Sequence, residues 1–194
     1  IAETGGMNAM IVDSTALPEH AVRDILQSAF QSAGQRCSAL RCLYVQEDVA
    51  DKIIHMLKGA MNELSIGDPW HLTTDVGPVI DETARAGIQD HIDAARMDGR
   101  VLHTLIAPVT GTFIAPTAIR VNGIGDLTRE IFGPVLHIAT YKSSDLGKVI
   151  ADINSTGYGL TFGLHTRIDD RVQQVVANIH AGNIYVNRNQ IGAV

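Results

Sequence analysis

Cysteine is scarce in this sequence, with only Cys37 and Cys42 among 194 residues. A pair of cysteines is too small a ligand set for a structural zinc site, and the eight histidines are dispersed without a metal-ligand spacing. A bound metal is therefore not expected. Two cysteines also argue against a disulfide framework, and they suit a reducing cytoplasm in which Cys37 stays a free thiol.

Positive charge is also in short supply. The chain has 15 Lys and Arg against 21 Asp and Glu, a net charge of −6, so a basic nucleic-acid-binding face is not expected. No apolar stretch is long enough to cross a bilayer, and neither a signal peptide nor a Gly-x-Gly-x-x-Gly fingerprint is visible. Hydrophobic residues make up 45% of the chain, which is enough for a sizeable core and argues against general disorder.

Short apolar runs alternate with amphipathic segments, which predicts an α/β fold in which helices cover a sheet. Pro18 opens the first predicted helix, where its missing N–H is tolerated, and Asp48 is expected to cap the second. The predicted strands are 7–12, 41–46, 101–105, 112–121, 135–141, 160–166 and 183–186. The predicted helices are 18–33, 48–64, 82–97, 144–154 and 169–179, and 122–129 is expected to be a mobile loop.

The run Gly34-Gln35-Arg36-Cys37-Ser38-Ala39-Leu40-Arg41 holds the strongest candidate for chemistry. A thiolate attacks carbonyl carbon well, and the positive charges of Arg36 and Arg41 favour the thiolate form. Gly34 lets the backbone turn just before the cysteine, as at the end of a helix. On these local grounds Cys37 is a candidate nucleophile, although a lone cysteine near arginines is more commonly a small, inert core residue.

Two acidic motifs accompany the cysteine. Glu3 stands just before Gly5-Gly6, where the backbone can bend sharply, and a carboxylate there is suited to activating water near a thioester. The run Glu130-Ile131-Phe132-Gly133-Pro134 combines an acid, an aromatic ring and a Gly-Pro break before an apolar strand. Taken separately, Glu130 can be a surface carboxylate and Phe132 an ordinary core aromatic.

In this order the three motifs resemble the signatures of the aldehyde dehydrogenase superfamily, over nearly the whole chain. The branch that they resemble most is the delta-1-pyrroline-5-carboxylate (glutamate semialdehyde) dehydrogenase part of bifunctional proline utilisation A. Thr4-Gly5-Gly6-Met7 stands where many other branches have Leu-Gly-Gly-Lys. The resemblance implies an α/β catalytic domain with helices over a mostly parallel sheet. It also implies NAD-dependent oxidation of L-glutamate γ-semialdehyde to glutamate in proline catabolism.

The resemblance implies a role for each motif residue. Cys37 attacks the aldehyde to form a thiohemiacetal, hydride passes to NAD, and Glu3 activates the water that hydrolyses the resulting thioester. The backbone N–H of Cys37 is one oxyanion donor. Glu130 is expected to hydrogen-bond the nicotinamide ribose and Phe132 to border the nicotinamide. Ser38 is expected to help hold the substrate carboxylate, with capping of a local turn as the alternative.

The resemblance also implies how the chain is divided. Residues 1–194 are expected to be the catalytic domain, with residues 1–5 the end of an upstream NAD-binding domain. The rest of that domain and a C-terminal loop that anchors the substrate carboxylate are expected to lie outside this sequence, so the isolated chain should be close to inactive. NAD is the implied cofactor, and FAD would belong to a proline dehydrogenase domain further upstream. The full-length protein is expected to be a cytoplasmic homo-oligomer, with peripheral binding to the inner membrane left open.

Three alternative functions stay open. One is an aldehyde dehydrogenase for another small aldehyde. Another is a CoA-acylating relative, against which Glu3 argues because a water-activating base favours release of the free acid. The third is a non-catalytic scaffold descendant of the fold, against which the presence of both Cys37 and Glu3 argues.

Overall fold

The computed structural model describes residues 5–192, which contain one seven-stranded sheet. Its strands are β1 (Asn8–Val12), β2 (Leu40–Gln46), β3 (Val101–Thr104), β4 (Thr117–Arg120), β5 (Val135–Tyr141), β6 (Thr161–His165) and β7 (Asn183–Val186). They are arranged in the order β3-β4-β5-β2-β1-β6-β7. Every neighbouring pair is parallel except β3 and β4, which are antiparallel. The predicted mostly parallel sheet is thus confirmed.

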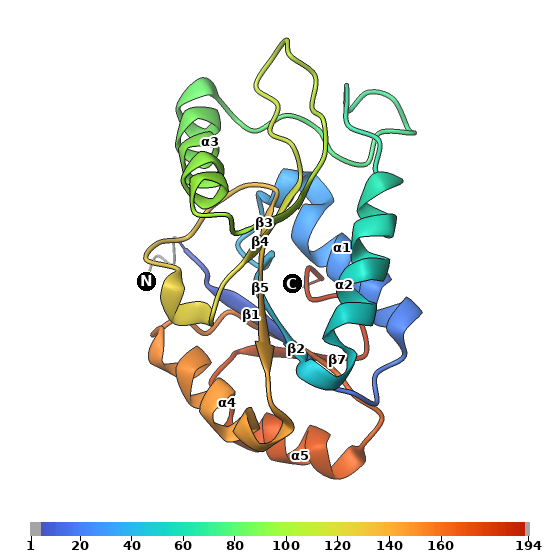
Figure 1. Cartoon of the computed structure of the whole chain (residues 1–194), viewed down its shortest axis with the longest axis vertical. Helices are drawn as coiled ribbons and strands as arrows, with labels where there is room; N and C mark the ends of the chain where they lie inside the picture. Colours follow the sequence, from blue (N-terminus) through green and yellow to red (C-terminus); the bar gives the residue numbers. More distant parts are fainter. Residues whose placement is uncertain (1–4, 193–194) are drawn as a thin grey trace.

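Side chains of the buried strands alternate between two cores, as the pleat of a strand requires. In β1, Met10 and Val12 join one core, while Ala9 and Ile11 join the other. The first core is covered by α1 (Pro18–Phe30), α2 (Glu47–Asn62) and α3 (Glu82–Met97), and the second by α4 (Leu146–Ser155) and α5 (Asp169–Asn178). Figure 1 shows α4 and α5 side by side below the sheet, away from α1, α2 and α3. The predicted α/β architecture is therefore a three-layer arrangement.

Several predicted helix boundaries differ from the observed ones, and two of these differences have a clear local cause. The first helix ends at Phe30, because Ser32 and Ala33 take left-handed conformations, with φ of 57° and 53°, in a short 3-10 turn that leads to the cysteine motif. The second helix begins at Glu47, and its N-terminus has no side-chain cap. The Asp48 carboxylate instead accepts a hydrogen bond from Gln46 Nε2 at 2.6 Å. The negative charge of Asp48 still lies in the first turn of the helix, where it interacts favourably with the positive end of the helix dipole.

The predicted strand 112–121 is shortened to β4. Thr112 pairs with another loop, because its carbonyl accepts from the Val79 N–H at 2.8 Å and its hydroxyl donates to the Val79 carbonyl at 2.6 Å. The predicted mobile loop 122–129 contains a 3-10 turn at Ile124–Asp126. The Ile124 N–H donates to the buried hydroxyl of Tyr44 at 2.7 Å, which anchors this loop to the core.

Two further properties bear on function. Within residues 5–192, no helix is long and apolar enough to cross a membrane. No three His, Cys, Asp or Glu side chains of that range are placed to share a metal ion.

His137 lies buried in the middle of the sheet, on β5 and beside β2. Its Nδ1 is 3.0 Å from the Arg41 carbonyl oxygen and its Nε2 is 2.9 Å from Nε2 of His91. Burial lowers the pKa of His137 from 6.5 to about 4, and the hydrogen bond to the Arg41 carbonyl opposes that shift only in part. The folded protein therefore favours the neutral ring.

The free energy of unfolding should consequently fall as the pH drops from 6.5 to about 4. In this window the unfolded ring binds a proton that the folded ring does not, so acid favours the unfolded state. His137→Leu should remove up to about 3 kcal/mol of this pH-dependent change in the free energy of unfolding. Denaturant titrations of the 194-residue chain and the variant across this pH range measure the effect. Parallel pH curves for the two proteins would show that His137 does not cause it.

Candidate active site

The three sequence motifs meet at the amino ends of adjacent parallel strands. Gly5-Gly6 precedes β1, the cysteine loop (residues 34–39) precedes β2, and the run 130–134 precedes β5. Because β5, β2 and β1 are neighbours in the sheet, segments far apart in the sequence come together. In open α/β sheets, ligands usually bind outside the carboxyl ends of the strands. The motifs of this chain lie at the opposite edge.

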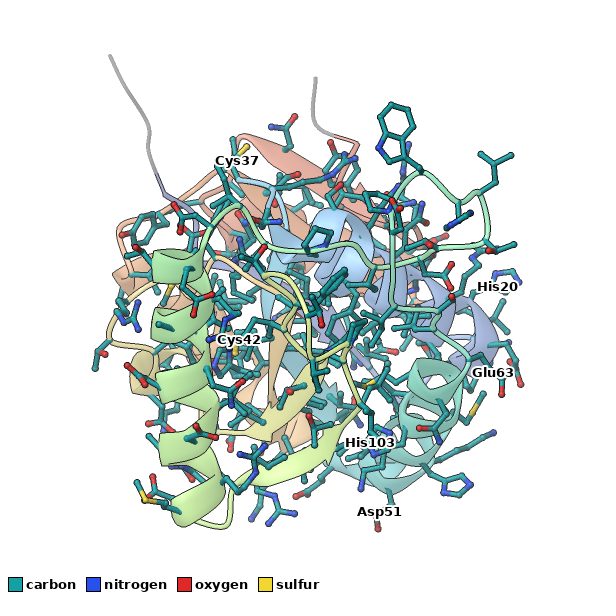
Figure 2. The ribbon with its side chains drawn as sticks, turned by 90° about the horizontal axis from the view of Figure 1, so that it is seen from above. His20, Cys37, Cys42, Asp51, Glu63 and His103 are labelled. Carbon is teal, nitrogen blue, oxygen red and sulfur yellow. The ribbon has the colours of Figure 1, made fainter. Side chains whose placement is uncertain are left out.

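The two cysteines differ sharply in environment. Cys37 is exposed, whereas Cys42 lies on β2 and is fully buried. Figure 2 shows Cys37 near the upper edge of the molecule and Cys42 among side chains further inside. Burial raises the pKa of the Cys42 thiol, which disfavours its thiolate. Cys37 is therefore the candidate nucleophile.

Arg41 joins the cysteine loop to the third motif from a fully buried position on β2. Its Nη1 donates to the Gly34 carbonyl at 2.7 Å and its Nη2 to the Arg36 carbonyl at 3.1 Å. Nε and Nη2 also donate to Oε1 of Glu130, at 3.2 and 3.0 Å. The guanidinium carbon lies 5.1 Å from the centre of the Phe132 ring. The Arg41 side chain therefore connects the cysteine loop to the run 130–134.

The charge of Arg41 acts on two groups. We expected it to act on Cys37, and the two groups do interact electrostatically, but Glu130 forms an ion pair with Arg41 and interacts with it more strongly. Burial lowers the pKa of Arg41, and the negative charge of Glu130 opposes that shift. Arg36 is directed elsewhere, since its Nε donates to the Ser32 hydroxyl at 3.0 Å and its Nη1 to the Ile191 carbonyl at 3.4 Å.

Glu130 also contacts the Gly5-Gly6 motif. Its Oε2 accepts from the Gly6 N–H at 3.0 Å, and the side chain remains 12% exposed. Position 6 requires a glycine because a Cβ atom there would lie 2.5 Å from the carbonyl oxygen of Cys37. The missing side chain therefore allows the first strand and the cysteine loop to approach closely.

A depression of about 360 Å³ borders Glu130 and Phe132 on the side of α3. Asp81, Ala84 and Arg129 also line it. Phe132 is 43% exposed, so its ring is accessible from the hollow. A carboxylate and an aromatic face beside one hollow suit a ligand that has both hydroxyl groups and a flat ring.

Glu3 and Ser38 are the remaining residues for which the sequence predicts a role in the site. Glu3 lies outside the described residues. Ser38 is 4% exposed, and no hydrogen bond to another residue in the range 5–192 uses its hydroxyl. The turn-capping alternative for that hydroxyl therefore finds no partner in the described part of the chain.

The sequence analysis missed Asn8 and Thr161. Asn8 Nδ2 donates to the Cys37 carbonyl at 2.7 Å and to the Ala39 carbonyl at 2.9 Å, and Thr161 Oγ1 donates to the Ser38 carbonyl at 3.2 Å. A signal was present for Asn8, which is the one polar residue in the otherwise apolar β1 sequence NAMIV. A buried polar residue in such a strand needs a hydrogen-bond partner.

A sequence model of the aldehyde dehydrogenase family matches residues 1–194. The chain belongs to the aldehyde dehydrogenase family. It is 52% identical to the bifunctional protein PutA of Klebsiella aerogenes, over 100% of this chain and 15% of PutA. It is 36% identical to 1-pyrroline-5-carboxylate dehydrogenase 1 of Halalkalibacterium halodurans, over 100% of this chain and 38% of that protein. This family member thus spans only part of the length of these relatives.

Solved structures give the same family assignment. A PutA structure from Bradyrhizobium japonicum superposes with a TM-score of 0.96 at 52% identity, over 99% of this chain and 20% of that one. A Thermus 1-pyrroline-5-carboxylate dehydrogenase with bound NAD superposes with a TM-score of 0.90 at 31% identity. That match covers 99% of this chain and 37% of the Thermus enzyme. The aldehyde dehydrogenase fold predicted from the three motifs is confirmed.

Proposed function

We propose that this chain is the catalytic segment of an NAD-dependent enzyme that oxidises L-glutamate γ-semialdehyde to glutamate in proline catabolism. The observation that carries the proposal is the exposed Cys37 thiol on a loop that Arg41 joins to Glu130. The choice of substrate is supported by similarity to PutA and to 1-pyrroline-5-carboxylate dehydrogenases, at 52% and 36% identity.

The chain's own residues account for the covalent steps. The Sγ of Cys37 adds to the aldehyde carbon, and the electron pair of the C=O double bond moves to oxygen. The Cys37 backbone N–H donates to this oxyanion as its charge develops. After oxidation of the thiohemiacetal to a thioester, Glu3 takes a proton from a water molecule that attacks the thioester carbon. Glutamate leaves, and Cys37 returns as the thiolate. Ser38 is proposed to bind the carboxylate of the substrate.

The residues around Glu130 suit a nicotinamide cofactor. When bound, NAD supplies the acceptor for the hydride that leaves the thiohemiacetal carbon. Glu130 would hydrogen-bond a ribose hydroxyl through Oε2, because that oxygen keeps accepting capacity beyond its one bond from the Gly6 N–H. Phe132 offers an exposed apolar ring at the same hollow. The buried Arg41 guanidinium fixes the Glu130 carboxylate through two hydrogen bonds to Oε1.

The remaining parts of the proposal concern the whole protein. Residues 1–194 form its catalytic domain, with residues 1–5 the end of the NAD-binding domain. The complete enzyme is a homo-oligomer in the cytoplasm, where the free thiols of Cys37 and Cys42 are stable. An FAD-binding proline dehydrogenase domain upstream accompanies it, as the similarity to bifunctional PutA supports.

The test is a substrate comparison with the complete enzyme. Glutamate semialdehyde and propanal are each assayed with NAD, with and without CoA, and the acid and thioester products are quantified. We expect one glutamate for each NADH and a kcat/KM for glutamate semialdehyde that is at least about 100-fold higher, because only this substrate offers a carboxylate to bind. A preference for propanal would indicate a different aldehyde. Acyl-CoA as the product would indicate the CoA-acylating class, and absence of turnover would favour a scaffold.

A further inference from the structure

The carbonyl groups of the cysteine loop are held from inside the protein, one after another. The Arg36 carbonyl accepts from the Ala39 N–H at 3.1 Å and from Arg41 Nη2 at 3.1 Å. Asn8 on β1 donates to the Cys37 and Ala39 carbonyls, and Thr161 on β6 donates to the Ser38 carbonyl between them. Four successive peptide oxygens are thus directed toward buried donors.

This arrangement determines where the loop's N–H groups point. In a trans peptide the N–H is directed opposite to the C=O of the same unit, and the peptide bonds of the described chain are trans. The Cys37 N–H therefore points away from the donors that hold the Arg36 carbonyl, and the Ser38 N–H points away from Asn8. Among the residues that the structure describes, neither N–H has a hydrogen-bond acceptor. Both are therefore free to donate to a ligand bound at the loop that carries the exposed thiol.

Asn8 maintains the orientation of the Cys37–Ser38 peptide, because it holds the Cys37 carbonyl. It is 3% exposed, and its Oδ1 accepts from the Thr161 N–H at 3.2 Å. The amide therefore cannot flip without losing that bond, so Nδ2 stays directed at the two loop carbonyls. Gly6 leaves the space for this contact, since a Cβ atom there would lie 3.0 Å from Asn8 Nδ2.

We propose that Asn8 is a positioning residue: by holding the Cys37 carbonyl it fixes the Cys37–Ser38 peptide and keeps the Ser38 N–H directed at the oxyanion of the bound aldehyde, beside the Cys37 N–H that Arg41 orients through the Arg36 carbonyl. The inference rests on the proposed function and adds a residue to which no motif assigns a role. Thr161 supports the same loop through the Ser38 carbonyl. Asn8 itself never touches the substrate, so its removal should weaken the oxyanion contact without removing the nucleophile.

Two reactions of Cys37 separate these effects in the complete enzyme. Acylation by glutamate semialdehyde, followed as the NADH burst, or by p-nitrophenyl acetate, creates an oxyanion. Alkylation by iodoacetamide creates none and needs only a reactive, accessible thiol. Asn8→Ala should slow acylation about 10- to 100-fold. It should leave the alkylation rate within about twofold, because the thiol stays exposed.

Two further variants keep the test decisive. Thr117→Val removes a buried hydroxyl that donates to the Ala115 carbonyl at 2.8 Å, away from the cysteine loop, and should change neither rate. Thr161→Val should slow acylation selectively but less than Asn8→Ala, and it decides the question if the Asn8 variant does not fold. Equal loss of acylation and alkylation, or no loss, would overturn the proposal. If the wild-type enzyme is acylated by the ester but ignores glutamate semialdehyde, the proposed function fails while the Asn8 comparison remains valid.

Discussion

Replacing Cys37 with alanine should reduce aldehyde oxidation by the complete enzyme by at least about 10⁴-fold. The thiol is the group that bonds to the aldehyde carbon, and its loss removes both the thiohemiacetal and the thioester from the reaction. NAD affinity should be nearly unchanged, because Glu130 and Phe132 keep their contacts with Arg41. Steady-state NADH formation and calorimetric titration with NAD measure the two quantities.

The second cysteine provides the matched control. Cys42 is buried on β2 and burial raises the pKa of its thiol, so it cannot replace the exposed nucleophile. Cys42→Ala should keep nearly full turnover, apart from a modest loss of stability from the small cavity. Substantial turnover by Cys37→Ala, or a selective loss of turnover in Cys42→Ala, would remove Cys37 as the nucleophile.

Replacing Arg41 with methionine should destabilise the 194-residue chain by about 3–5 kcal/mol. Methionine fills much of the same volume but leaves the Glu130 carboxylate without its cation. It also leaves the Gly34 and Arg36 carbonyls without the guanidinium donors. Breaking a buried pair on one side costs more than removing both charges, since an isolated charge stays behind. Urea denaturation measures the free energy of unfolding.

A double-mutant cycle separates the ion pair from general packing. The loss in Arg41→Met combined with Glu130→Gln should be smaller than the sum of the two single losses, because neither charge is then left alone. The exposed Arg85–Glu82 pair on α3 is the matched comparison, and Arg85→Met should cost less than about 0.5 kcal/mol. Additive losses at Arg41 and Glu130, or a loss at Arg41 no larger than at Arg85, would contradict a structural role for the buried pair.

Several elements were predictable because their signals are local. The bounds of α3, β5 and β7 agree with those expected from the sequence. In α3 the cause is visible, since Asp81 accepts from the Ala84 N–H at 2.7 Å as an N-cap, ahead of an apolar face at helical spacing. The end of α1 and the segment 112–116 were mispredicted because left-handed residues and pairing with Val79 decide them. No local pattern records such contacts.

The sequence by itself determined the family and pointed to Cys37, because three motifs in a set order are specific even when each is modest alone. Only the tertiary structure decided what the motif residues touch. Arg41 is near Cys37 in the chain, yet its side chain reaches Glu130, 89 residues away. The contacts of Asn8 with the cysteine loop exist only because β1 pairs with β2. Strand order and register place these groups within hydrogen-bonding distance, and both arise from the packing of the whole sheet between two layers of helices.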